Sequence, residues 1–191
     1  MPATLLLWNA YVVVRGTTQL TALGADPVAA LEIRTGLWTI RFLAITLAVS
    51  PLRELSGVGA LAKYRRMLGL FTFFYACLHL LTYVGLDQGL DFGEIWKDIA
   101  KRKFITVGFA AFELLIPLAI TSTKGMVKRL GFARWKRLHR LVYAAATLGV
   151  IHFLWRVKVV GREQLVYAGI LAVLLGVRVL FAVRERRPRS A

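Results

Sequence analysis

The sequence predicts an all-α integral membrane protein, a six-helix transmembrane bundle whose first helix is short. Two observations support this. First, 58% of the 191 residues are hydrophobic and the mean hydropathy is +0.61, whereas soluble domains are about 45–50% apolar. Second, the charged residues lie mainly between apolar segments long enough to cross a bilayer. No soluble domain fits between those segments, so residues 1–191 are expected to form a single transmembrane domain.

The first apolar segment, residues 1–16, accounts for the short first helix. It has roughly a dozen apolar residues, fewer than the ~20 that cross a hydrocarbon core. Five longer segments follow, each bounded by charge, glycine or proline, and Pro51 is expected to close the first of them. These segments cover residues 36–52, 67–86, 104–121, 138–156 and 165–183.

Basic residues set the expected orientation, because short cytoplasmic loops of membrane proteins are enriched in Lys and Arg. With six spans, fifteen Lys and Arg residues fall on one side, in segments 53–66 and 122–140 and in the C-terminal tail. Nine fall on the other side, which also holds most of the acidic residues. We therefore expect a multi-pass protein with both termini and the 122–140 loop in the cytoplasm.

Composition also excludes several classes of protein. The net charge of +16 would suit a nucleic-acid binder, but the basic residues flank apolar segments and form no separate basic domain, so nucleic acid is not an expected partner. The single Cys77 excludes an internal disulfide and a cysteine-rich metal site. No glycine-rich dinucleotide fingerprint or P-loop is visible, so the chain is not expected to bind NAD(P)H itself.

All three histidines of the chain lie in or at the edge of apolar spans. An ionisable side chain inside a membrane is costly and indicates a functional site, and imidazole is a common axial ligand of haem iron. His79 lies 13 residues after Arg66, and His152 lies 13 residues after His139. At ~1.5 Å per residue, both are roughly 20 Å from the cytoplasmic edge. Two helices running the same way would thus present one histidine each at one depth, as a haem clamped between them requires.

His139 is expected near the cytoplasmic edge, one tier lower. A second haem there would need another ligand, and the matching positions on the neighbouring span are Arg65 and Arg66, neither a normal iron ligand. On an ideal helix His139 and His152 point roughly 140° apart, so only a local distortion would turn both toward one partner. The alternative for each histidine is an interhelical hydrogen bond or, for His139, an interfacial position in a basic loop.

A series of motifs occurs in order along the chain. They are GADPVAALEIRTGLW (24–38), TLAVSPLR (46–53), RRMLGL (65–70), LHLLTY (78–83), LAITS (118–122), LHRLVY (138–143) and IHFLW (151–155). Together they resemble MsrQ, a family of haem-binding membrane subunits of bacterial methionine sulfoxide reductase systems. That family belongs to the ferric-reductase-like transmembrane superfamily. The resemblance covers about residues 24–183, and the chain departs from it at the N-terminus, where a full first helix is usual.

The resemblance implies a six-helix protein of the bacterial inner membrane that binds haem b (one or two) and FMN. It implies that electrons enter on the cytoplasmic side, from a flavin reductase or the quinone pool. They leave to a periplasmic molybdopterin-containing methionine sulfoxide reductase subunit, which repairs oxidised periplasmic proteins. The family's haem-binding histidines correspond to His79, His139 and His152.

Three arginines are further candidates for cofactor binding. Arg65, Arg66 and Arg140 are expected at the inner membrane edge, where each would pair with a haem propionate or an FMN phosphate. The alternative is that they anchor the chain at a surface of anionic lipid.

Glu113 is a charged residue within the span 104–121. We expect it to be buried and to pair with Arg41 or Arg178, which also lie in apolar spans. The alternative is a role in proton or electron transfer.

Three functions are consistent with these residues. The first is an electron-transfer membrane subunit with haem as the carrier. The second is a stand-alone transmembrane reductase of ferric iron or quinone on the same fold, which differs in its electron acceptor. The third is a transporter whose intramembrane histidines relay protons, and a visible spectrum separates it from the other two.

Overall fold

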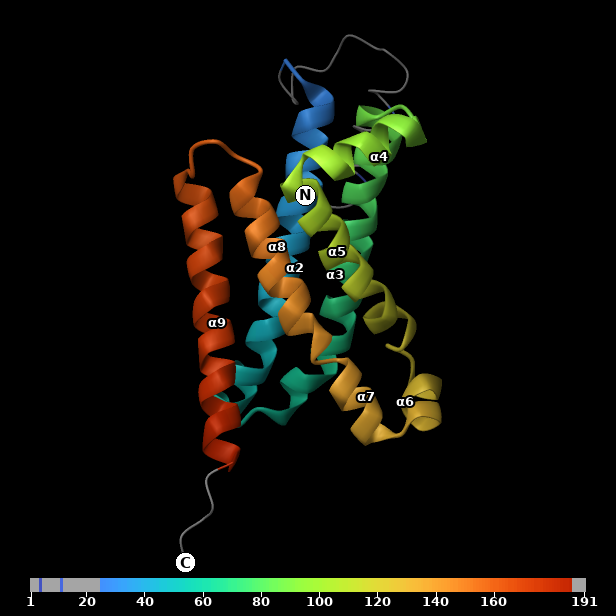
Figure 1. Cartoon of the computed structure of the whole chain (residues 1–191). Coiled ribbons are helices and arrows are strands. Elements are labelled where there is room, and N and C mark those ends of the chain that lie inside the picture. The colour runs from blue at the N-terminus through green and yellow to red at the C-terminus, as the bar shows by residue number, and fades with distance from the viewer. Residues whose placement is uncertain (1–3, 5–10, 12–24, 187–191) are drawn as a thin grey trace, which may run out of the picture.

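The computed structural model describes residues 25–186 together with Thr4 and Tyr11, and this part of the chain is an all-helical bundle without strands (Figure 1). The helices are α2 (Pro27–Ser56), η1 (Gly59–Leu61), α3 (Ala62–Leu81), the π-helical η2 (Thr82–Asp87), α4 (Phe92–Lys101), α5 (Lys103–Ile120), α6 (Lys124–Leu130), α7 (Phe132–Leu138), α8 (Leu141–Trp155) and α9 (Arg162–Arg186). Apart from Thr4 and Tyr11, the expected short first helix lies outside the described residues, so the sixth span stays a prediction.

Five helical segments of the described chain are long and apolar enough to cross a membrane. They are Pro27–Ser56, Gly59–Asp87, Lys103–Ile120, Phe132–Trp155 and Arg162–Phe181. Each coincides with one of the five longer spans predicted from hydropathy. The predicted all-α membrane architecture is therefore confirmed.

The ends of α2 are set by capping residues rather than by hydropathy. Pro27 occupies the first turn, and the Asp26 side chain accepts a hydrogen bond from the Ala29 N–H at 2.9 Å. The expectation that Pro51 closes this span is wrong, because the helix continues through it to Ser56. A proline inside a helix removes one hydrogen bond, whereas the left-handed Gly57 (φ 70°) ends the helix.

Three short helices lie where loops were expected. Asp91 caps α4 by accepting from the N–H groups of Gly93 and Glu94, and Thr123 caps α6 by accepting from Met126. The basic segment 122–140 thus forms α6 and α7 rather than an irregular loop. All three helices are too short to span a bilayer, so a search for long apolar runs does not find them.

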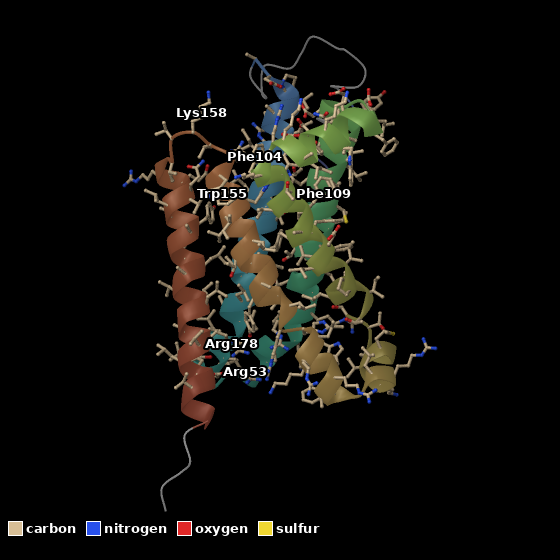
Figure 2. All side chains as sticks on the ribbon, viewed as in Figure 1. Arg53, Phe104, Phe109, Trp155, Lys158 and Arg178 are labelled. Atoms are coloured by element: carbon tan, nitrogen blue, oxygen red, sulfur yellow. The ribbon has the colours of Figure 1, made fainter. Side chains whose placement is uncertain are left out.

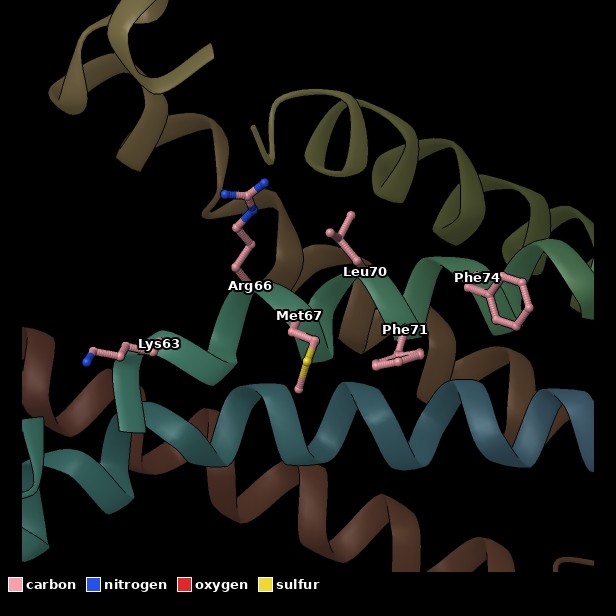
Figure 3. A pocket seen from close by; sticks show the side chains of 6 residues that line it. All are labelled: Lys63, Arg66, Met67, Leu70, Phe71 and Phe74. Atoms are coloured by element: carbon pink, nitrogen blue, oxygen red, sulfur yellow. The ribbon is translucent and has the colours of Figure 1, made fainter. Parts of the chain in front are cut away.

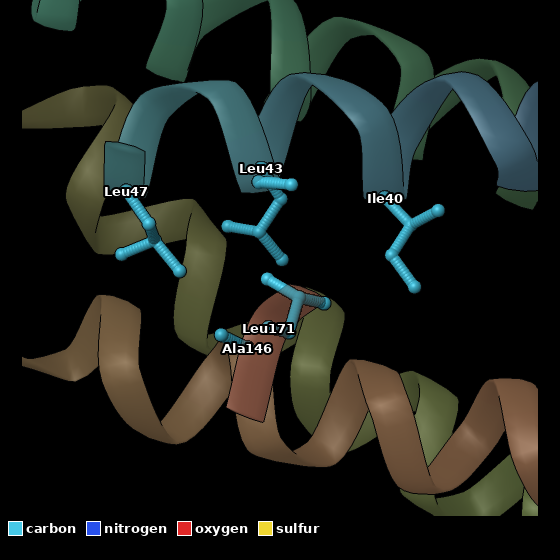
Figure 4. Close-up of a cluster of buried hydrophobic side chains, with 6 residues drawn as sticks. Ile40, Leu43, Leu47, Ala146 and Leu171 are labelled. Carbon is cyan, nitrogen blue, oxygen red and sulfur yellow. The ribbon is translucent and has the colours of Figure 1, made fainter. Parts of the chain in front are cut away.

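The long helices follow one another around the bundle. α2 packs mainly on α3 and also contacts α9, α5 packs mainly on α8, and the pairs α3–α5 and α8–α9 complete the arrangement (Figure 1). The largest buried cluster joins α2, α8 and α9 (Figure 4) and consists of Ile40, Leu43, Ala44, Leu47, Ala146 and Leu171. Ala146 is fully buried within it, and such a small residue lets neighbouring helices approach closely.

Different elements lie at the two ends of the bundle. α6, α7 and the C-terminal end of α9 lie at one end, here called the basic end, and Arg53 and Arg178 lie toward it (Figures 1 and 2). α4 and the α8–α9 connection, which carries Lys158, lie at the other, here called the α4 end. The basic segments 53–66 and 122–140 therefore share one end of the molecule, as the predicted connectivity requires.

Candidate functional site

Two of the three histidines meet inside the bundle. His79 on α3 and His152 on α8 have ring centroids 6.0 Å apart, with their planes at 75°. His152 lies beside Phe104, which is near the α4 end (Figure 2). The two residues are 73 positions apart in sequence, and the fold brings together the pair for which equal depth was predicted.

Both rings are oriented by a backbone carbonyl of another helix. The Nδ1 atom of His79 lies 3.0 Å from the Glu32 carbonyl oxygen on α2, and that of His152 lies 2.8 Å from the Phe104 carbonyl oxygen on α5. Since a carbonyl only accepts, each Nδ1 carries the proton and donates it. Each Nε2 then keeps its lone pair, and within the described chain neither Nε2 has a hydrogen-bond partner. This is the tautomer that binds a metal through Nε2.

Two glycines make room for these rings. A Cβ atom placed on Gly36 of α2 would lie 3.3 Å from Cε1 of His79, and one placed on Gly108 of α5 would lie 2.6 Å from Nδ1 of His152. Each imidazole therefore packs on a stretch of helix surface that has no side chain.

The spacing of the rings fits a shared axial ligand set. A metal–imidazole nitrogen bond is about 2 Å long, so two imidazoles on opposite sides of one metal ion have ring centres roughly 6 Å apart. Among the described residues no group of three or more His, Cys, Asp or Glu side chains could hold a bare metal ion. Two imidazoles alone suit a metal that brings its remaining ligands with it, as haem iron does.

His139 lies at the basic end, apart from the other two histidines. It stacks on Trp135 with ring centroids 4.0 Å apart, and its Nδ1 donates to the Trp135 carbonyl at 3.1 Å. Its Nε2 is buried and has no partner in the described structure. The chain turns between α7 and α8 at His139 and Arg140, so the angle worked out for an ideal helix does not apply. The Leu118 backbone lies close enough to act on this imidazole, and no second histidine faces it.

The three candidate arginines lie at the basic end but do not form one cluster. Arg65 donates to the Ser50 hydroxyl at 3.3 Å and is close enough to His139 to act on it electrostatically. Arg140 is exposed at the start of α8. Arg66 lies with Lys63 at one end of a shallow groove of ≈ 590 Å³ along α3 (Figure 3), whose apolar part is lined by Met67, Leu70, Phe71 and Phe74. Arg65 and Arg140 are thus the two candidates near His139, the first through its charge and the second as its neighbour in the chain.

Arg156 is a candidate that sequence reasoning missed. It follows His152 by one turn, caps α8, and acts electrostatically on His79, His152 and Glu32. One carboxylate oxygen of Glu32 is buried there and has no partner among the described residues. The spacing of four residues from His152 is a signal that was present in the sequence.

The expected pairing of Glu113 is wrong. Its side chain is exposed on the outer face of α5 rather than buried. Arg41 instead donates to the Tyr167 hydroxyl at 2.7 Å, and Arg178 donates to the Tyr143 hydroxyl at 2.7 Å. Hydropathy placed these charges at similar depth, but it carries no information on which face of a helix each one occupies.

Comparison with known proteins identifies close relatives. Residues 35–150 match the family described as the ferric reductase like transmembrane component. The chain is 56% identical over 169 residues to a Rhodospirillum rubrum protein, covering 88% of this chain and 81% of that one. It is 53% identical over 186 residues to one from Xanthomonas euvesicatoria pv. vesicatoria (97% and 84%), and 53% identical over 171 residues to one from Herminiimonas arsenicoxydans (88% and 78%). All three relatives are named protein-methionine-sulfoxide reductase heme-binding subunit MsrQ.

Proposed function

The chain belongs to the ferric-reductase-like transmembrane family and, within it, to the MsrQ haem-binding subunits, and from this premise we propose that it carries electrons across the bacterial inner membrane on haem b. The electrons enter on the cytoplasmic side, from a flavin reductase or quinone. They are delivered to a periplasmic molybdopterin-containing methionine sulfoxide reductase subunit.

The observation that carries this proposal is the His79–His152 pair. Two imidazoles from different helices lie 6.0 Å apart, and each has its Nδ1 proton donated to a backbone carbonyl and its Nε2 lone pair free. These two residues are the proposed axial ligands. Bound haem supplies a one-electron carrier whose potential depends on its axial ligands and their hydrogen bonds.

The surrounding residues suit a charged cofactor. Arg156 caps α8 one turn after His152 and its charge acts on both rings, so we propose that its guanidinium pairs with a carboxylate such as a haem propionate. At the basic end, His139 offers a buried Nε2, and Arg65 lies nearby. We assign this tier to electron entry, through a second haem or FMN, with Arg66 and Arg140 as further phosphate or propionate partners.

The orientation follows from charge. The basic end is assigned to the cytoplasm because Lys and Arg are retained on that side of the membrane. The α4 end, toward which His79 and His152 lie, is then periplasmic. On this assignment the proposed outer haem lies on the side where we propose that the reductase partner docks.

The test is haem content in three single variants, His79→Ala, His152→Ala and His139→Ala. Purified wild-type protein is expected to show a non-covalent b-type spectrum, since the chain has no CxxCH attachment motif. The first two variants should each lose the same low-spin haem, because removing either axial ligand opens the iron. The double variant His79→Ala/His152→Ala should lose no more haem than either single variant.

His139→Ala is the variant to compare with these two, since that residue lies at the basic end. It should retain the outer haem and instead slow haem reduction by a cytoplasmic flavin reductase. A colourless wild-type protein from haem-replete cells contradicts the electron-carrier function. Loss of the low-spin haem in His139→Ala, with retention in His79→Ala, contradicts the assignment of ligands.

A further inference from the structure

The same local arrangement occurs at both members of the histidine pair. The Nδ1 of His79 donates to the carbonyl of Glu32, and the residue four positions later is Gly36. The Nδ1 of His152 donates to the carbonyl of Phe104, and the residue four positions later is Gly108. One arrangement joins α2 to α3 and the other joins α5 to α8. The same combination of histidine, carbonyl and glycine therefore occurs twice, in segments that are far apart in the sequence.

Helix geometry explains why a glycine stands at this position. The carbonyl of residue i accepts the N–H of residue i+4, and the Cβ of residue i+4 leans back toward the helix N-terminus, over that carbonyl. A carbonyl oxygen has a second lone pair, but a side chain at i+4 covers the approach to it. Without a Cβ at Gly36 and Gly108, an imidazole from the neighbouring helix reaches the oxygen.

General helix packing does not account for these two glycines. Small residues let membrane helices approach, but Gly85, Gly149 and Gly169 have open space where a Cβ would stand. Among the described glycines, only Gly36 and Gly108 would bring a Cβ within 3.5 Å of a side chain from another helix, and in both cases that side chain is the histidine.

We propose that Gly36 and Gly108 are positioning residues for the haem ligands, each exposing a helix carbonyl that fixes the tautomer and the orientation of one imidazole. The proposal rests on the ligand assignment made above. A hydrogen bond from the second ring nitrogen raises the basicity of a metal-bound imidazole and so favours the oxidised metal. The two glycines therefore hold the haem and lower its reduction potential.

The distances predict unequal effects of alanine at the two sites. In Gly108→Ala the new Cβ would lie 2.6 Å from Nδ1 and 2.8 Å from Cε1 of His152, so the ring must move. In Gly36→Ala the closest contacts with His79 are 3.3 and 3.4 Å, which a shift of a few tenths of an ångström relieves. Gly108→Ala should therefore weaken haem retention by about 10-fold or more, the range for outer-shell partners. Gly36→Ala should keep its haem.

The experiment measures haem content, low-spin electron paramagnetic resonance and the midpoint potential of the full-length detergent-purified protein. In Gly36→Ala the hydrogen bond to Glu32 lengthens, so its midpoint potential should become more positive and its low-spin g-values should change. Gly149→Ala is the matched control, because it lies on α8 three residues before His152 and its Cβ would meet nothing within 4 Å. Alanine is also the better helix former, so this control should match the wild type in all three measurements.

The outcomes separate this proposal from the one it rests on. If the histidine variants lose haem but Gly36→Ala and Gly108→Ala both match Gly149→Ala, the ligand assignment stands and the positioning role is wrong. If the histidine variants retain haem, the ligand assignment fails first. If Gly108→Ala does not fold, Gly36→Ala still decides the matter, since an unchanged potential and unchanged g-values in that variant overturn the proposal.

Discussion

Helix α9 is held to the bundle by two similar arginine–tyrosine hydrogen bonds. Arg41 on α2 donates its Nε–H to the Tyr167 hydroxyl of α9 at 2.7 Å, and Arg178 on α9 donates its Nε–H to the Tyr143 hydroxyl of α8 at 2.7 Å. Among the described side chains of α9, only Leu171 is fully buried. We therefore expect Tyr167→Phe and Tyr143→Phe to destabilise the attachment of α9.

The magnitude follows from the partners that remain. A hydrogen bond to a charged group contributes about 1.5–3 kcal/mol in soluble proteins, whereas interhelical bonds in membranes average about 0.6 and reach about 1.7 kcal/mol. We expect about 1–2 kcal/mol for each substitution. Tyr167→Phe should cost at least as much as Tyr143→Phe. Arg41 is left with Glu163 at 3.9 Å and the Trp38 ring 5.1 Å from its guanidinium carbon, whereas Arg178 keeps the closer carboxylate of Glu54 at 3.5 Å.

The two effects should be additive. Tyr167 and Arg178 are eleven residues apart on α9, roughly 16 Å along the helix axis, and sites separated by more than about 10 Å act independently. The double variant should therefore lose about 2–4 kcal/mol.

The assay is reversible unfolding in mixed detergent micelles, followed by tryptophan fluorescence. Tyr64→Phe serves as the control, because Tyr64 is exposed and its hydroxyl has no hydrogen-bond partner in the described structure. That substitution should change the free energy of unfolding by less than about 0.5 kcal/mol. If Tyr167→Phe and Tyr143→Phe are both as neutral as Tyr64→Phe, the hydroxyl groups do not hold α9 and the reasoning is refuted.

Three further outcomes are expected. Reporter fusions in the 122–140 segment should report a cytoplasmic location, and an external location would reverse the proposed direction of electron flow. Arg156→Gln should lower haem retention without affecting the unfolding free energy of the apoprotein, as measured by haem titration; full retention would exclude Arg156 as a propionate partner. Trp135→Phe removes the 2.9 Å hydrogen bond to the Thr121 carbonyl and should cost about 1 kcal/mol. It should leave the spectrum of the outer haem unchanged. Loss of that spectrum would contradict the assignment of Trp135 to the basic end, away from the outer haem.

The sequence by itself determined the helical membrane fold, because hydropathy over some twenty residues reports directly whether a segment can cross hydrocarbon. It also predicted equal depth for His79 and His152, since helix rise converts residue count into distance, and the two rings meet in the structure. The grouping of segments 53–66 and 122–140 at one end followed from the number of spans. Each of these inferences depends only on position along the chain, which is what a sequence records.

Only the tertiary structure decided which faces of the helices meet. The carbonyls of Glu32 and Phe104 and the glycines beside them became recognisable as parts of the site once α2 faced α3 and α5 faced α8. The partners of Arg41 and Arg178 likewise depend on rotation about the helix axis, and depth alone had suggested Glu113. In a membrane, an apolar side chain is in a nearly equivalent environment whether it faces lipid or a neighbouring helix. Hydropathy therefore fixes the depth of a residue but leaves its rotational position to the packing of the whole bundle.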